Sequence, residues 1–96
     1  MNYKPLPDSL TIKKSNIQGL GLFAVKNIAK NTDLGMIHFS YGELLIRTPL
    51  GGFINHSLKP NCKKIDLDQE WHLKTLIDIK KDEELTLKYT MYNPEL

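Results

Sequence analysis

Apolar and polar side chains alternate with a period of two along much of this chain. The regular stretches are residues 10–13, 71–79 and 85–89, and short apolar runs lie at 20–25 and 34–39. Such alternation is typical of half-buried β-strands, whose successive side chains point to opposite faces. Residues 43–47 fit either a strand or one helical turn, and no twelve-residue segment has the period of an amphipathic helix. The sequence therefore predicts a mainly β fold of many short strands.

Turn-forming residues separate these segments at short intervals, at 15–21, 30–33, 49–52, 57–61 and 80–83. Residues 66–70 resemble the start of a calcium loop but lack its glycine and terminal glutamate, so we expect a solvated hairpin turn there. The segment 48–62 is rich in Gly, Pro, Asn and Ser, yet it carries Phe53 and Ile54 at its centre. We expect it to tuck into the body of the protein.

Composition narrows the class of protein. The 96 residues suffice for one domain, residues 1–96, with a thin core, since a chain of this length buries only about 60–65% of its unfolded surface. Hydrophobic residues make up 41% and charged residues 25%, as in soluble globular chains, and no apolar run approaches the roughly 20 residues of a membrane helix. The net charge is +2 without a basic stripe, which argues against a nucleic-acid partner.

The N-terminus lacks the apolar core of a secretory signal, and Cys62 is the one cysteine. A single cysteine excludes a disulfide scaffold and a multi-thiolate zinc site within one chain. We therefore expect an intracellular location, the cytoplasm or, in a eukaryote, the nucleus. His38, His56 and His72 are too widely and irregularly spaced for a metal site, so we expect no metal.

Three segments carry candidate chemistry. Gly19 and Gly21 flank Leu20 just before an apolar run, and glycines so spaced let backbone amides approach a ligand. A tight turn or bulge is the structural alternative and, for such a pair alone, the commoner one. Residues 55–57, Asn-His-Ser, place three hydrogen-bonding side chains beside two apolar ones.

The third segment is the C-terminal alternation, which puts Tyr89 on the same strand face as Leu85 and Leu87. If that face is in the core, the phenol points inward and needs a hydrogen-bond partner or a chemical role. A core tyrosine bonded to a backbone carbonyl is the structural alternative.

Taken in order, these segments resemble the SET domain family. Residues 15–24 (SNIQGLGLFA) are similar to the family's S-x-I-x-G-x-G-h-F-A, residues 53–62 (FINHSLKPNC) to its F-I-N-H-S-C-x-P-N-C, and residues 83–89 (EELTLKY) to its G-E-E-L-T-x-D-Y. The resemblance covers roughly residues 9–92. It implies a β-clip-like fold of several small curved sheets with a C-terminal pseudoknot, which would unite the Asn-His-Ser loop and Tyr89 in one site.

The resemblance also implies an activity: methyl transfer from S-adenosylmethionine to the ε-amine of a lysine in a protein substrate. The implied cofactor-binding residues are Gly19, Leu20 and Gly21 at the methionine part, Asn55 at its amino-acid end and His56, mainly by backbone, at the adenine. Tyr89 would be the catalytic residue, beside the transferred methyl. The implied substrate channel involves Tyr41, Phe53 and Tyr92.

Departures from the family pattern keep a second interpretation open, a SET-like module that binds cofactor or peptide with little or no turnover. Ser40 stands where the family has a tyrosine, and only ten residues separate Gly42 from Phe53, where the family usually inserts a helical segment. Leu58 replaces a cysteine that often joins a zinc site. Without the insert we expect an uncovered apolar surface, which consists of Leu44, Leu45, Ile46, Leu50 and Phe53. A partner protein or a second copy of the chain could cover it, and we favour the homodimer.

Overall fold

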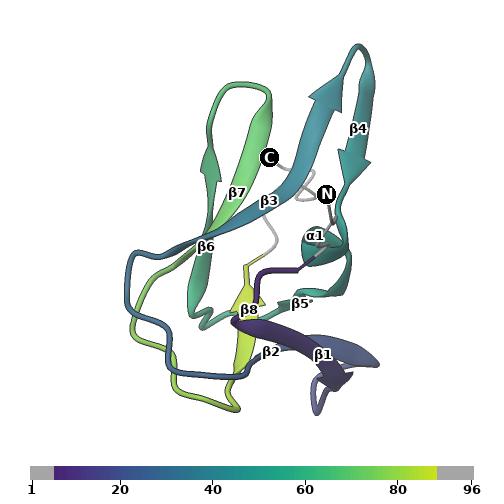
Figure 1. Ribbon diagram of the computed structural model, residues 1–96. Helices are drawn as coiled ribbons and strands as arrows, with labels where there is room; N and C mark the ends of the chain where they lie inside the picture. The colour runs from purple at the N-terminus through teal and green to yellow at the C-terminus, as the bar shows by residue number, and fades with distance from the viewer. Residues whose placement is uncertain (1–5, 89–96) are drawn as a thin grey trace.

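The computed structural model describes residues 6–88, which form a curled β-sheet of eight strands (Figure 1). The strands are β1 (Leu10–Lys14), β2 (Leu20–Ala24), β3 (Asp33–Tyr41), β4 (Leu44–Arg47), β5 (Asn55–His56), β6 (Cys62–Asp66), β7 (Glu70–Thr75) and β8 (Glu84–Leu87). One short helix, α1 (Pro49–Phe53), lies between β4 and β5. The prediction of a mainly β fold is confirmed.

Strand β8 pairs with three other strands, β2, β5 and β6. The strand order is β1-β2-β8-β6-β7-β3-β4, and β5 pairs with β8 outside this path. β8 runs antiparallel to β2 and parallel to β5 and β6. Through these pairings, the segments near residues 20 and 55 lie beside the last strand described, near residue 85. The residues after Lys88, through which a C-terminal pseudoknot would continue, lie outside the described part of the chain.

Two antiparallel hairpins stand next to each other, because β7 pairs with β3 (Figure 1). The β6–β7 turn contains Asp68 and Gln69, both with positive φ, 55° and 41°. Two successive positive φ values are the feature of the type I′ turns that suit the twist of paired strands. The hairpin turn predicted at 66–70 is therefore confirmed. The β3–β4 hairpin turns through Gly42, whose φ of 63° favours glycine.

The core lies inside the curl of the sheet. Leu22, Leu73 and Leu85 are 0% exposed and come from three different strands. Leu50 and Ile54, from α1 and its C-cap, are both 2% exposed, so the segment 48–62 packs into the body as predicted. Burial of Leu50 corrects one expectation: it belongs to the core and not to an uncovered apolar surface. Phe53 is half-buried against the same core.

The strand pattern departs from the sequence prediction at two places. β7 ends at Thr75, although the alternation continues to Ile79. The Thr75 hydroxyl donates to the Ala29 carbonyl oxygen at 2.7 Å and accepts from the Thr32 N–H at 2.8 Å, so the chain leaves the ladder to bind the loop before β3. β6 was not predicted, because its residues do not alternate. Residues 44–47 form a strand. Across residues 6–88 no helix is long and apolar enough to cross a membrane.

Candidate functional site

The three sequence segments with candidate chemistry meet at the carboxylate of Glu84. Ser15 Oγ donates to its two oxygens at 2.8 and 2.9 Å, and the Asn55 amide donates to Oε2 at 2.9 Å. Glu84 begins β8, Ser15 follows β1 and Asn55 begins β5. A half-buried carboxylate requires such donors, because taking a charge out of water without partners is costly. The Glu84 side chain therefore links Ser15, 69 residues before it, with Asn55, 29 residues before it.

Asn55 also fixes the loop between β1 and β2. Its Nδ2 lies 3.2 Å from each of two carbonyl oxygens, those of Gln18 and Leu20. Parallel pairing with Thr86 sets the height of Asn55 along β8. The amide nitrogen of Asn55 is therefore engaged by the protein itself, and its primary role in the free chain is to hold the loop against the sheet.

The two glycines of this loop serve different purposes. Gly21 is buried, and a Cβ there would overlap Glu84 Oε2 and lie 3.0 Å from Asn55 Nδ2. Gly19 has φ 48°, with open space where its Cβ would be. Gly21 is required because the Glu84 side chain lies where a Cβ would be. Gly19 is favoured because its positive φ suits glycine in the turn. The space beside Gly19 is the part of the loop that a ligand can reach.

The loop is hydrogen-bonded on its inner side and exposed on its outer side. The Ser15 N–H donates to the Gly19 carbonyl oxygen at 2.8 Å, and Ser15 Oγ accepts from the Ile17 N–H at 2.9 Å. Ile17 and Leu20 are 51% and 50% exposed. The outer face therefore combines exposed backbone with two exposed apolar side chains, a surface suited to a partly apolar ligand.

A second amide anchors the far end of the 53–62 segment to the same strand. Asn61 Nδ2 donates to the Glu84 carbonyl oxygen at 2.9 Å, and Asn61 Oδ1 accepts from the Thr86 N–H at 2.8 Å. Sequence reasoning did not single out Glu84 or Asn61, although both lie inside the quoted motifs. Their positions in the motifs could have identified these two residues as site residues. The local pattern of polar and apolar residues does not distinguish them.

The remaining predicted site residues are placed as follows. His56 pairs with Leu87 in the parallel β5–β8 ladder, and its side chain is exposed. Tyr41 is 70% exposed at the tip of the β3–β4 hairpin, far from β5 in Figure 1. Tyr89 and Tyr92 lie outside the described residues. The structure thus brings Gly19, Leu20, Gly21, Asn55 and His56 to one region, and Tyr41 stands apart from them.

Burial favours the uncharged forms of two buried groups, Cys62 and His38. Cys62 is 1% exposed, and burial raises the pKa of its thiol to about 12, which keeps it neutral and a poor nucleophile. His38 stacks on Trp71 with ring centroids 4.8 Å apart. Burial, then the charges of Lys64 and Arg47, lower the pKa of His38. Among residues 6–88 no group of His, Cys, Asp and Glu could hold a metal ion.

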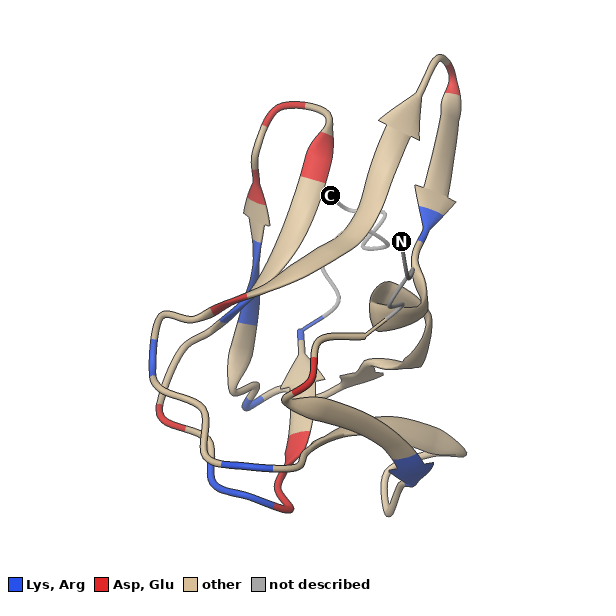
Figure 2. Cartoon of the chain, in the orientation of Figure 1, with Lys and Arg blue, Asp and Glu red and all other residues tan. Residues whose placement is uncertain are grey.

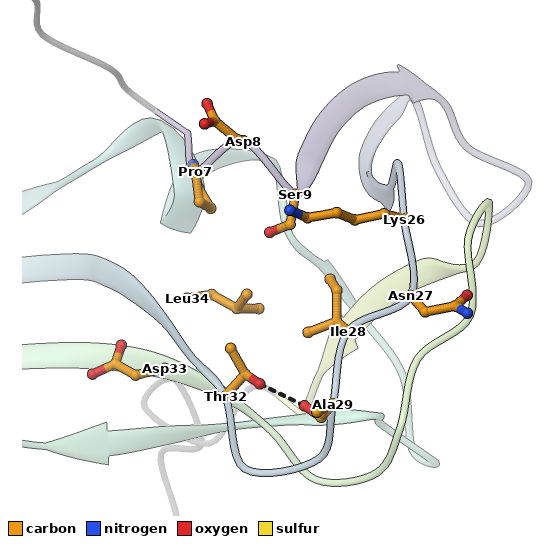
Figure 3. A pocket seen from close by; sticks show the side chains of 10 residues that line it. All are labelled: Pro7, Asp8, Ser9, Lys26, Asn27, Ile28, Ala29, Thr32, Asp33 and Leu34. Atoms are coloured by element: carbon orange, nitrogen blue, oxygen red, sulfur yellow. Dashed lines mark hydrogen bonds between the residues drawn. The ribbon is translucent and has the colours of Figure 1, made fainter.

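Three hollows lie elsewhere on the described surface. One, of about 390 Å³, is framed by Asp8, Lys26 and Leu34 (Figure 3). Another, of about 430 Å³, adjoins it around Ile28 and Ile79, and a third, of about 240 Å³, lies beside Leu87. None of the predicted site residues lines these three hollows. The Gly19–Asn55–Glu84 region is defined by its hydrogen bonds and by the exposed residues of its loop.

Many solved structures share this fold, and two of them are named as methyltransferases. A Plasmodium falciparum protein provisionally assigned as a histone methyltransferase superimposes with a TM-score of 0.73, at 20% identity over 88% of this chain and 95% of that one. The methyltransferase domain of human PR domain-containing protein 2 superimposes with a TM-score of 0.71, at 20% identity over 95% of this chain and 84% of that one. At this identity the likeness shows the fold. No curated protein sequence matches the chain.

Sequence comparison with protein families gives the assignment. The family model of the SET domain matches residues 40–90, more than half of the chain. The matched segment contains Asn55, Asn61 and Glu84, three of the residues that build the network described above. Together with the shared fold, this match shows that the chain belongs to the SET domain family.

Proposed function

We propose that this chain is a protein-lysine N-methyltransferase that uses S-adenosylmethionine. The observation that carries the proposal is the convergence of three family motifs on Glu84, through Ser15 and Asn55. The network holds an open loop against the start of β8, the strand that ends two residues before Tyr89. Both structural relatives are named as methyltransferases, one of them for histones, so a histone is the first substrate to test.

The charge of the site supports this cofactor. S-adenosylmethionine carries a positive sulfonium, a positive ammonium and a negative carboxylate group, a net charge of about +1 at neutral pH, and the Glu84 carboxylate lies beside Gly21. The space beside Gly19 is open to a ligand. We propose that the backbone of Gly19, Leu20 and Gly21 binds the methionine part, with Asn55 at the amino-acid end and His56 at the adenine. When bound, the cofactor supplies an electrophilic methyl group.

The protein's own contribution would be positioning and control of protonation. In-line displacement at the methyl carbon needs no covalent step from the protein, and orientation supplies much of the barrier reduction. The lysine amine must arrive neutral, and an apolar channel favours this by lowering its pKa. We propose that Tyr89, a neutral phenol, orients the amine. Phe53 and Tyr92 are the proposed aromatic lining, and a contribution of Tyr41 would have to come from the tip of the β3–β4 hairpin.

A SET-like module without turnover is the second candidate, and a specific observation favours it. In residues 43–52 the chain forms only a hairpin turn, β4 and the start of α1, where the family usually has a longer helical segment. Ser40 also replaces a family tyrosine. Both changes reduce the surface available to enclose a substrate lysine.

Two measurements made together distinguish the methyltransferase from the binding module. Thermal melts with S-adenosylmethionine and S-adenosylhomocysteine measure binding, and tritiated methyl transfer into histones and a mixed protein lysate measures turnover. The enzyme predicts stabilisation by both ligands and label on lysine, with label lost in Tyr89→Phe while its melting temperature is unchanged. Stabilisation without label supports the binding module. No stabilisation and no label at millimolar cofactor contradicts both.

A further inference from the structure

We infer that β4 is a docking edge for a second copy of this chain, in a two-fold dimer centred on Leu45. β4 ends the sheet, and β3 is its one strand partner within residues 6–88. All four β4 residues are exposed, and the exposed large apolar side chains of the described chain are densest in this hairpin. Tyr41 is 70%, Leu44 62% and Leu45 53% exposed. Exposed apolar residues on an edge strand, beside unpaired backbone groups, favour pairing with another strand.

The two edges of the sheet differ in their protection. Edge strands that stay single usually carry lysines, proline or a bulge that discourages pairing. β1, at the opposite edge, ends in Lys13 and Lys14. β4 contains neither lysine nor proline, and its register with β3 is unbroken. In Figure 2 the outer strand of this hairpin is uncoloured between a red end at the turn and a blue end at its base. β4 is short and ends in Arg47, so the uncharged part of this edge is the three residues Leu44, Leu45 and Ile46.

The backbone of β4 presents unused hydrogen-bonding groups at this edge. Ser40 lies opposite Leu45, and the Ser40 N–H donates away from β4, to the Gln69 carbonyl oxygen at 2.8 Å. Residues opposite each other in a non-hydrogen-bonded pair point their N–H and C=O groups in opposite directions. The N–H and C=O of Leu45 therefore point to the open edge.

Symmetry and side-chain chemistry select one register. Neighbouring pairs in an antiparallel ladder alternate between hydrogen-bonded and non-hydrogen-bonded, so a two-fold axis must pass through a residue and its own copy. With Leu45 facing Leu45 of the second copy, Leu44 faces Ile46 and Glu43 faces Arg47 at both ends. If the two-fold axis passed through Leu44 or Ile46 instead, Leu45 would face Glu43 or Arg47 of the second copy.

The segment from 43 to 47 is thus self-complementary in both apolarity and charge. Opposite charges directly across a ladder stabilise the pairing, and like charges weaken it. A heterologous partner strand would need no such internal symmetry, which favours a second copy over an unrelated peptide. This interface lies apart from the Glu84 network, so the inference does not depend on the proposed function.

Sedimentation velocity and light scattering on the full chain at 10–200 μM provide the test, with concentrations chosen as on the order of typical weak-dimer affinities. The expected mass is twice the 11.0 kDa of one chain. Leu45→Lys places two ammonium groups directly opposite each other and should weaken dimerisation at least about tenfold, a 1.4 kcal/mol change. Leu58→Lys is the matched control, because Leu58 is 77% exposed outside the hairpin.

A charge exchange tests the register. Glu43→Arg should weaken the dimer, since it faces Arg47 of the second copy, and Glu43→Arg with Arg47→Glu should restore it. Circular dichroism melts of each variant confirm folding. A wild-type monomer at 200 μM, a dimer insensitive to Leu45→Lys, or a double variant no tighter than Glu43→Arg would each overturn the inference.

Discussion

The tightest contact in the candidate site gives the sharpest prediction, the substitution Gly21→Ala. A Cβ at this position would overlap Glu84 Oε2 and lie 3.0 Å from Glu84 Cδ, so the carboxylate must move. Movement takes it away from Ser15 Oγ and the Asn55 amide, now 2.8–2.9 Å away. The backbone itself tolerates alanine, because Gly21 is not among the glycines with positive φ.

The magnitude follows from the bonds at risk. A hydrogen bond to a charged group contributes about 1.5–3 kcal/mol, so loss of two donors at a half-buried site costs about 3 kcal/mol. Alanine restricts the unfolded chain and returns about 0.4–1 kcal/mol. The net loss is about 2 kcal/mol, which lowers the melting temperature of a domain this size by about 8–16 °C. A chain of this length has about 5–14 kcal/mol in total, so the variant stays folded.

Urea denaturation of four chains measures the coupling: wild type, Gly21→Ala, Glu84→Ala and the double variant. With Glu84 truncated, the overlap with Oε2 is gone and only the 3.0 Å contact with Asn55 Nδ2 remains, so Gly21→Ala should cost less than in the wild type, about 0.5–1 kcal/mol. Gly52→Ala is the matched control, because its Cβ would meet nothing closer than 3.9 Å. An equal cost of Gly21→Ala in both backgrounds would refute the claim that the carboxylate is what excludes a side chain.

Three further predictions follow from individual side chains. Asn55→Ala should lower the free energy of unfolding by about 1–3 kcal/mol, since its bonded acceptors lose their donor, and should weaken S-adenosylhomocysteine binding in calorimetry; unchanged affinity would leave Asn55 a purely structural residue. Hydrogen bonding to Glu70, then to Asp33, raises the pKa of His72 against its partial burial. Stability from charged His72 is therefore complete below the unfolded pKa of about 6.5 and lost as pH rises through the higher folded pKa. His72→Gln should remove this loss from urea melts taken between pH 6 and 8.5, buffer values on the order of that pKa window, and an unaltered pH profile would contradict the assignment. Cys62, with its pKa raised to about 12, should react with iodoacetamide only after unfolding, and rapid labelling of the native protein would exclude the packing described.

The strands that the sequence predicts well are those that bury one face. β1 and β7 alternate visibly, because one set of their side chains enters the core. β6 was missed because Cys62 is buried while Lys63 and Lys64 follow it directly, so its residues give no period of two. The end of β7 was missed because Thr75 leaves the ladder for partners in the loop before β3, and such a partner is distant in sequence.

The site residues divide in the same way: some can be identified from the local sequence, and others depend on partners that are distant in sequence. The glycines and the Asn-His-Ser sequence were visible as candidates, because closely spaced glycines let backbone amides approach a ligand and because three hydrogen-bonding side chains lie beside two apolar ones. Glu84 was not, because it follows Asp82 and Glu83 and resembles a solvated turn. Its role depends on Ser15, 69 residues away, and on Asn55. Leu50 was misplaced for a related reason, since only the packing of α1 beneath β3 decides which of several nearby apolar residues becomes buried.

A crystal structure of the chain with S-adenosylhomocysteine tests the central claim most directly. Our account predicts the methionine part of the ligand along the backbone of Gly19, Leu20 and Gly21, its amino-acid end at Asn55 and its adenine at His56, with the Glu84 network intact. Clear density for the protein with no ligand at this loop under saturating conditions, or the ligand bound only in the hollow framed by Asp8, Lys26 and Leu34, would contradict it.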